Sequence, residues 1–353
     1  MKKRILIAVT AILFALFLIV ICIFSNETET PAYEPVEEDS IRIGMSFDSF
    51  VIERWLRDRD VFVSTARELG AEVNVQNANG DIEEQKKHID YFIDKGMDAI
   101  VIICIDSYGL RDHVQKALDA GIKVIAYDRL ITDANVDLYI SFDNAMVGTM
   151  MAEALVDSGI KDGNVLMLGG SSTDSNVPMV EGAFREVMEK NNVTILDAIH
   201  AENWEAEVAG TYVYEHVDVV SKTDAIMCGN DDLASQVVPA LAARRLAGNI
   251  LVVGQDADLQ ACQRIVEGTQ LMTVYKPVEK LAKRAAECVV ELIETDCITG
   301  DDLTTFDDGT YEVPYIGIMP ISVTEENINE VIIDSGFHLK EDVYLNVPAK
   351  MPK

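Results

Sequence analysis

Basic residues are scarce in this chain. Its 353 residues include 29 Lys and Arg against 60 Asp and Glu, which gives a formal net charge of −31. Nucleic acids are polyanions, and the proteins that bind them present a basic face to the phosphates. We therefore expect no nucleic-acid partner. The acidity favours a soluble surface and carries little information about the fold.

Cysteine and histidine are few and scattered. The six cysteines form no close C-x-x-C pair, and Cys104 and Cys228 lie in apolar segments typical of a core. The five histidines form no recognisable metal-ligand cluster or nucleophile–base pair. Asp301-Asp302 and Asp307-Asp308-Gly309 lack the ligand spacing of an EF-hand. We expect no disulfide framework, no metal, no cofactor and no catalytic residues.

The chain has one long run without charge. Lys2-Lys3-Arg4 precedes Ile5–Phe24, whose one polar side chain is Thr10. At about 1.5 Å per residue the run spans roughly 30 Å, one hydrocarbon core. We expect residues 1–24 to be a signal or anchor helix, with the rest of the chain outside the cytoplasm and attached to the cell membrane. A cleaved signal peptide and lipidation at Cys22 are the alternatives.

Glycine and proline are not enriched either, so most of the chain should be folded. Residues 25–40 are the exception, because SNETETPAYEPVEEDS is typical of an acidic flexible linker. From residue 41, apolar strands alternate with segments of helical periodicity. Strands are expected at 41–45, 71–75, 99–103, 124–127, 138–142, 165–168, 194–196, 225–228 and 250–253. Helices are expected at 58–69, 82–95, 110–120, 145–158, 177–190, 206–216 and 233–243. This alternation predicts an α/β fold with parallel sheets in two Rossmann-like lobes.

Tryptophan occurs only twice, and each indole lies in a polar setting: Trp55 follows Arg54, and Trp204 follows Asn203. A sugar ring stacks its C–H faces on aromatic planes, and its hydroxyls pair with carboxylate, guanidinium and carboxamide groups. Such groups follow the predicted strands, where open parallel sheets bind ligands. They are Asp128, Arg129, Asp174, Asn176, Asn230, Asp256 and Lys276. The sequence thus predicts a cleft between two lobes for a neutral polar ligand.

Each of these residues also has a structural interpretation. Trp55 could be a core residue, and Asp128-Arg129 could be a surface ion pair or turn. Asp256 could cap a helix, since aspartate is favoured at that position. Asn230-Asp231-Asp232 opens a predicted helix, so one of the three is expected to cap it.

Several segments, each modest alone, occur in an order and spacing that resemble one family. They are Ile43-Gly44-Met45, Glu53-Arg54-Trp55 with Asp58-Arg59-Asp60, Val75-Gln76-Asn77-Ala78-Asn79-Gly80, Ala126-Tyr127-Asp128-Arg129, Tyr139-Ile140-Ser141-Phe142-Asp143-Asn144, Gly254-Gln255-Asp256-Ala257-Asp258-Leu259, Gly268-Thr269-Gln270 and Thr273-Val274-Tyr275-Lys276-Pro277. From about residue 41 to about 340 the chain resembles bacterial periplasmic binding proteins for pentoses and hexoses. Within that family it is most similar to the xylose-binding members.

The resemblance implies a set of sugar contacts. Carried over position by position, they are Arg54, Asp128, Arg129, Asp174, Asn176, Trp204, Asn230, Asp256 and Lys276, with Trp55 as a second stacking face. Residues 202–210 and 169–178 depart from the family pattern, which leaves the sugar preference less certain than sugar binding itself.

The resemblance also implies a type I periplasmic-binding-protein fold, two lobes joined by a three-strand hinge. We expect crossings near Asp143, near Gln255–Asp258 or Lys276, and near Tyr311–Pro314. The N-terminal lobe would hold 41–143 plus 277–312, and the C-terminal lobe 144–276 plus 313–345.

Such a protein would bind D-xylose or a related monosaccharide outside the membrane and deliver it to an ABC permease. The alternative is a membrane-anchored sensor subunit that reports the sugar to a membrane histidine kinase. A LacI-type repressor shares the fold, but it needs a basic helix-turn-helix where this chain has its apolar run. An enzyme is not expected.

Overall fold

The computed structural model describes residues 40–352. The expected anchor 1–24 and residues 25–39 of the expected linker lie outside the described residues. Within 40–352 no helix is both long and apolar enough to cross a membrane.

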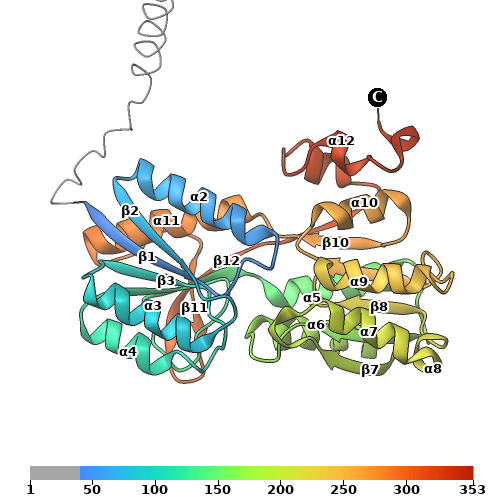
Figure 1. Ribbon diagram of the computed structural model, residues 1–353, viewed down its shortest axis with the longest axis horizontal. Coiled ribbons are helices and arrows are strands. Elements are labelled where there is room, and N and C mark those ends of the chain that lie inside the picture. The colour runs from blue at the N-terminus through green and yellow to red at the C-terminus, as the bar shows by residue number, and fades with distance from the viewer. Residues whose placement is uncertain (1–39, 353) are drawn as a thin grey trace, which may run out of the picture. The chain divides into compact units, whose positions relative to one another are not determined.

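The first lobe is built on a seven-stranded sheet of order β11-β12-β5-β4-β3-β1-β2 (Figure 1). All neighbouring strands are parallel except β11, which runs antiparallel to β12. Strand β3 is buried along its whole length, as its continuous apolar sequence predicts. The strands are β1 (Ile41–Phe47), β2 (Ala71–Asn77), β3 (Ala99–Ile102), β4 (Lys123–Tyr127), β5 (Leu138–Phe142), β11 (Leu303–Asp307) and β12 (Glu312–Ile318).

The second lobe is built on a six-stranded sheet of order β13-β10-β9-β8-β6-β7. It is parallel except for β13, which pairs antiparallel with β10. The strands are β6 (Asn164–Gly169), β7 (Thr194–His200), β8 (Ala225–Cys228), β9 (Leu251–Gln255), β10 (Met272–Tyr275) and β13 (Ile321–Thr324). Two α/β lobes with mostly parallel sheets confirm the predicted fold class.

Helices cover both faces of each sheet (Figure 1). In the first lobe, α3 and α4 share one core layer and α2 packs on α11 in another. In the second lobe, α5 packs on α6 and α7 packs on α9. The longer helices are α2 (Arg54–Glu68), α3 (Ile82–Asp94), α4 (Arg111–Asp119), α5 (Asn144–Asp157), α6 (Asn176–Lys190), α7 (Glu207–Glu215), α9 (Asp231–Ala242), α10 (Leu259–Glu267) and α11 (Val278–Thr295). The short ones are η1 (Glu202–Trp204), α8 (Val217–Val220), η2 (Asn329–Ile333), α12 (Lys340–Val343) and η3 (Pro348–Lys350).

Helix α2 begins earlier than the sequence predicts. We expected it from Asp58, whereas it begins at Arg54. The residue before it, Glu53, makes no side-chain cap, so no Ser, Thr, Asp or Asn marks the start. In consequence Arg54 and Trp55 occupy the first helical turn, where both are buried.

Three segments pass between the lobes. The chain crosses at Asp143 after β5, at Lys276-Pro277 after β10, and at Met319-Pro320 after β12. The third crossing lies later than the expected Tyr311–Pro314. Strand β12 stays paired with β5 as far as Ile318, opposite Phe142, so residues 313–318 belong to the first sheet rather than to the second lobe.

Candidate ligand-binding site

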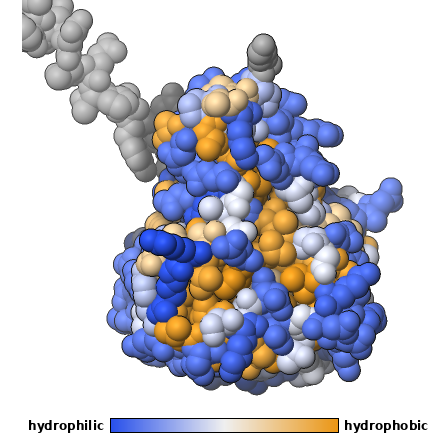
Figure 2. All heavy atoms as spheres, turned by 90° about the vertical axis from the view of Figure 1, so that its right-hand side faces the viewer, coloured by the Kyte–Doolittle hydropathy of each residue, from blue (hydrophilic) through white to orange (hydrophobic). Residues whose placement is uncertain are grey.

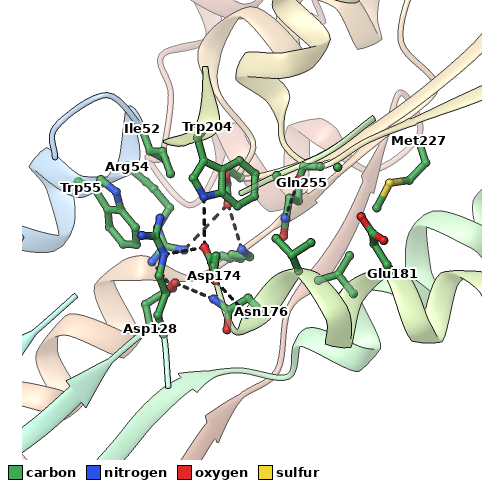
Figure 3. Close-up of a pocket in the computed structure, with 18 residues that line it drawn as sticks. Ile52, Arg54, Trp55, Asp128, Asp174, Asn176, Glu181, Trp204, Met227 and Gln255 are labelled. Atoms are coloured by element: carbon green, nitrogen blue, oxygen red, sulfur yellow. Dashed lines mark hydrogen bonds and ion pairs between the residues drawn. The ribbon is translucent and has the colours of Figure 1, made fainter. Parts of the chain in front are cut away.

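A pocket lies between the two lobes, at the carboxyl ends of β4, β6, β8, β9 and β10. About 450 Å³ of space between the lining residues is free of protein atoms, and part of it is open to solvent. Its lining residues are Ile52, Arg54, Trp55, Asp128, Arg129, Gly169, Gly170, Asp174, Asn176, Val177, Val180, Glu181, Trp204, Met227, Gly229, Gln255, Asp256 and Lys276 (Figure 3). All the predicted site residues except Asn230 are among them.

Arg54 and Trp55 enter the pocket from the first turn of α2. The Arg54 guanidinium donates from Nε to Asp58 Oδ2 at 3.2 Å and from an Nη to Asp128 Oδ2 at 2.6 Å. Its carbon also lies 4.3 Å from the centre of the Trp55 ring, within the range of a cation–π contact. The guanidinium and the indole are therefore held together, so Trp55 serves the core and the pocket at once.

Asp128 follows β4 with a positive φ of 65°, which turns the chain sharply at the strand end. Its carboxylate accepts hydrogen bonds from Arg54 and from Asn176 Nδ2, the latter at 3.0 Å. Burial favours a raised pKa, but Arg54, Lys276 and Arg129 outweigh it, so the pKa of Asp128 is lowered. Asp128 is an ionised acceptor at neutral pH, and it is buried rather than part of a surface pair.

Arg129 joins the two lobes through ionic contacts. In its own lobe it donates to Asp48 Oδ2 at 2.9 Å and to the Cys104 carbonyl at 3.0 Å. Across the pocket its Nε lies 2.6 Å from Asp174 Oδ2, although the direction is too far from linear for a hydrogen bond. Burial raises the pKa of Asp174 more than Arg129 lowers it. The site therefore holds two charges from different lobes against each other in a dry environment.

The Trp204 indole lies directly against Gly170 and is hydrogen-bonded to Asp174. Its indole Nε1 donates to Asp174 Oδ2 at 3.2 Å. Asn203 and Trp204 both have positive φ, 52° and 59°, which is uncommon for residues with side chains and clusters at ligand sites. The ring covers Gly170 so closely that a Cβ there would lie 2.1 Å from it. This position therefore requires glycine.

Gln255, Asp256 and Lys276 complete the pocket from β9 and β10. Lys276 Nζ lies 3.2 Å from Asp256 Oδ1. Asp256 has a φ of 96°, a conformation rarely adopted by residues other than glycine. Its side chain faces the pocket and caps no helix, since α10 begins at Leu259. Gln255 donates from its amide to the Gly229 carbonyl.

Polar atoms in this pocket lack partners. Buried side-chain atoms without a hydrogen bond include Trp55 Nε1, Gln255 Oε1, Asp256 Oδ1 and Glu181 Oε1. Leaving such a group unpaired costs about 1–3 kcal/mol. Arg129 Nε also lacks a hydrogen bond. Two donors, on Trp55 and Arg129, and two acceptors, on Gln255 and Asp256, thus lack partners in the pocket, while the Glu181 oxygen lies at the end away from Arg54 and Trp55 (Figure 3).

Asn230 does not line the pocket. Its Oδ1 accepts the Leu233 N–H at 2.9 Å and caps α9, so the capping interpretation of this residue is correct. The neighbouring Gly229 lines the pocket instead. Among the lining residues outside the inferred contacts are Ile52, Glu181, Met227 and Gln255. Gln255 ends a buried strand directly before Asp256, a position that could have identified it; no signal in the sequence marks the other three.

Three direct hydrogen bonds join the two lobes beside the pocket. The Ser107 N–H donates to the Thr173 carbonyl at 3.0 Å, and Thr173 Oγ1 donates to the Ile105 carbonyl at 3.0 Å. The Leu130 N–H donates to Ser175 Oγ at 2.8 Å. We call these three bonds the latch. They join loops of the first lobe to the β6–α6 loop of the second without using any pocket side chain.

Among residues 40–352, no group of His, Cys, Asp and Glu side chains is arranged to hold a metal ion.

Known proteins resemble the chain over most of its length. Residues 43–296 match the family described as periplasmic binding protein domain. The chain is 40% identical over 311 residues to the D-xylose-binding periplasmic protein of Haemophilus influenzae, covering 86% of this chain and 92% of that protein. It is 39% identical over 308 residues to the D-xylose-binding periplasmic protein of Escherichia coli, with the same coverage.

Solved structures agree with the fold. An ABC transporter solute-binding protein from Clostridium phytofermentans with bound β-D-glucose matches with a TM-score of 0.77 and 26% identity, covering 86% of this chain and 99% of that one. The myo-inositol-binding protein of Caulobacter matches with a TM-score of 0.74 at 20% identity, covering 83% and 96%, and shows the fold alone. These relatives are binding proteins, which agrees with the expectation that the chain is not an enzyme. The chain belongs to the periplasmic binding protein domain family, as its sequence motifs indicate.

Proposed function

We propose that this protein is an extracytoplasmic receptor for D-xylose or a closely related pentose. The observation that carries the proposal is the composition of the interlobe pocket. Two indoles and three ion pairs line it, and several of its buried polar atoms lack partners. The names of the relatives in Haemophilus influenzae and Escherichia coli support D-xylose as the first sugar to test.

The ion pairs favour a neutral ligand. Each cation of the pocket already has a carboxylate beside it: Arg54 with Asp128, Arg129 with Asp174, and Lys276 with Asp256. A charged ligand would have to displace one of these partners in a dry site, which costs several kcal/mol. A pentose carries no charge, and each of its hydroxyls can donate to a carboxylate while accepting from a guanidinium or ammonium group.

The two aromatic residues suit a ring. Trp55 comes from the first lobe and Trp204 from the second, so a bound sugar contacts both lobes. A ligand that contacts both lobes binds the closed form better and raises its population in proportion to that difference. The binding event is thereby converted into a change of shape that a membrane partner can detect.

Calorimetry tests the proposal. The chain from residue 40 onward is titrated with D-xylose, L-arabinose, D-ribose and D-glucose while indole fluorescence is recorded. We expect D-xylose to bind and to shift the emission of Trp55 and Trp204. If none of the four sugars gives a heat of binding or a change in fluorescence, the proposal is wrong.

The partner we propose is an ABC permease that accepts the sugar. The second candidate is a membrane sensor kinase, and the feature that favours it is the uncharged run Ile5–Phe24, which has the length of a membrane span. Crosslinking of the full chain in membranes with and without D-xylose, followed by identification of the attached protein, separates the two. A mature N-terminus near Ser25, or a lipid on Cys22, would contradict attachment through this segment.

A further inference from the structure

The pocket continues past the residues that would contact a pentose. Asn176 is the first residue of α6 and bonds to Asp128, and the next turns of the same helix place Val177, Val180 and Glu181 along the pocket wall. Five residues of helix correspond to about 7.5 Å. Figure 3 shows Glu181 and Met227 together at one end, away from Arg54 and Trp55 at the other. We call this end, lined by Val177, Val180, Glu181 and Met227, the rear chamber.

Glu181 is the one charged group of the rear chamber, and it is 8% exposed. Its Oε1 accepts no hydrogen bond. His200 Nε2 lies 3.1 Å away but is out of line, and Arg185 reaches only Oε2, at 3.8 Å. A buried carboxylate oxygen without a donor is costly. The chamber thus offers a strong acceptor to any hydroxyl that reaches it.

A glycine keeps the chamber open. A Cβ on Gly169, the last residue of β6, would lie 2.2 Å from Glu181 Oε1. Any side chain there would displace the carboxylate from the chamber. The three other lining side chains are apolar, so the chamber matches a short group with a carbon stem and a hydroxyl tip.

Resting on the proposed function, we infer that Glu181 sets the tolerance of this receptor for aldohexoses. D-glucose is D-xylose with a hydroxymethyl group on C5. The rear chamber takes that group, its carbon against Val177, Val180 and Met227, and its hydroxyl donates to Glu181 Oε1. D-xylose leaves the chamber to water and makes no contact with Glu181.

Three sugars that differ only at C5 test the inference on the full chain: D-xylose, 6-deoxy-D-glucose and D-glucose. We expect D-glucose to bind at least tenfold more tightly than 6-deoxy-D-glucose, since the charged acceptor meets a donor only in the former. Glu181→Leu should weaken D-glucose at least tenfold, remove its advantage over 6-deoxy-D-glucose and weaken D-xylose far less than D-glucose. Glu189→Gln, an exposed position on the same helix, is the control and should change none of the three.

The outcomes separate the two claims. If D-xylose binds and D-glucose does not, or if Glu181→Leu weakens both sugars equally, the inference is wrong and the receptor function stands. If neither sugar binds, the inference is wrong, and the receptor function is also wrong if L-arabinose and D-ribose do not bind either. A folding defect in Glu181→Leu would appear as a lower melting temperature without sugar; Glu181→Gln, which keeps the size of the side chain, should then weaken D-glucose selectively, and equal loss of both sugars would overturn the inference.

Discussion

Asp256 is a single residue that keeps an unpaired acceptor in the pocket for a ligand. Its Oδ1 accepts no hydrogen bond, with Lys276 at 3.2 Å and Arg54 at 4.0 Å as ionic neighbours. Asp256→Asn should weaken D-xylose by about tenfold to a hundredfold, because a charged acceptor is lost where a hydroxyl donates. Calorimetry measures the loss. The melting temperature without sugar should move little; a large drop at unchanged affinity would make Asp256 structural.

Asp58 gives the protein a pH dependence behind the site. It accepts from Arg54 and from the Tyr127 hydroxyl, and burial raises its pKa to about 6 despite both partners. A carboxyl with a raised pKa contributes stability that is complete below its unfolded pKa, about 3.8, and is lost as pH rises through about 6. The rise of the Asp58 pKa from 3.8 to about 6 corresponds to about 3 kcal/mol of unfolding free energy.

The prediction concerns the free energy of unfolding between pH 4 and pH 7. Asp58→Asn can keep both hydrogen bonds, accepting from Arg54 and donating to Tyr127, while it removes the titration. Denaturant titrations at several pH values should show that the variant loses less stability than the natural chain as pH rises. Parallel curves for the two proteins would show that Asp58 is not the titrating group.

Secondary elements determine which residues face the pocket, and Gly170, directly after β6, is a case that can be tested. A Cβ there would meet the Trp204 ring at 2.1 Å, so Gly170→Ala must push the indole away from Asp174. We expect D-xylose binding to fall at least tenfold with loss of the indole fluorescence response. Gly182→Ala on α6, where nothing lies within 4 Å, is the matched control and should leave binding unchanged.

Asn230 should behave in the opposite way. Because it caps α9 and does not line the pocket, Asn230→Ala should cost about 1 kcal/mol of stability. The affinity of the folded protein for D-xylose should remain within twofold of the original. Denaturant titration measures the stability and calorimetry the affinity. Weaker binding at unchanged stability would show that Asn230 contacts the ligand.

The sequence was informative where one rule of topology applies. Polar residues directly after buried strands, such as Asp128 and Asp256, could be assigned to the pocket because parallel strands bring their carboxyl ends together. The start of α2 could not be predicted, since no capping residue precedes Arg54. Glu181 could not be predicted either, because it lies inside a helix whose periodicity marks it only as a wall position.

In the molecule as a whole, the three latch bonds stabilise the closed arrangement of the two lobes whether or not a sugar is bound. Ser175→Ala leaves the Leu130 N–H without its acceptor, which costs about 1–2 kcal/mol in the closed form only. We expect affinity for every sugar to fall by the same factor, about fivefold to thirtyfold. Ser172→Ala, whose hydroxyl bonds only Glu202, is the control. Small-angle scattering should show a larger radius of gyration for Ser175→Ala at subsaturating D-xylose.

The latch also affects how fast a bound sugar can dissociate. A sugar enclosed by two lobes leaves only after the lobes part, so the rate of dissociation cannot exceed the rate at which the three latch bonds open together. A membrane partner that competes for the Thr173 carbonyl or the Ser175 hydroxyl would shorten the residence of the sugar without touching the sugar. Unloading could then be driven from the rim of the cleft while the pocket keeps its full intrinsic affinity for the next molecule.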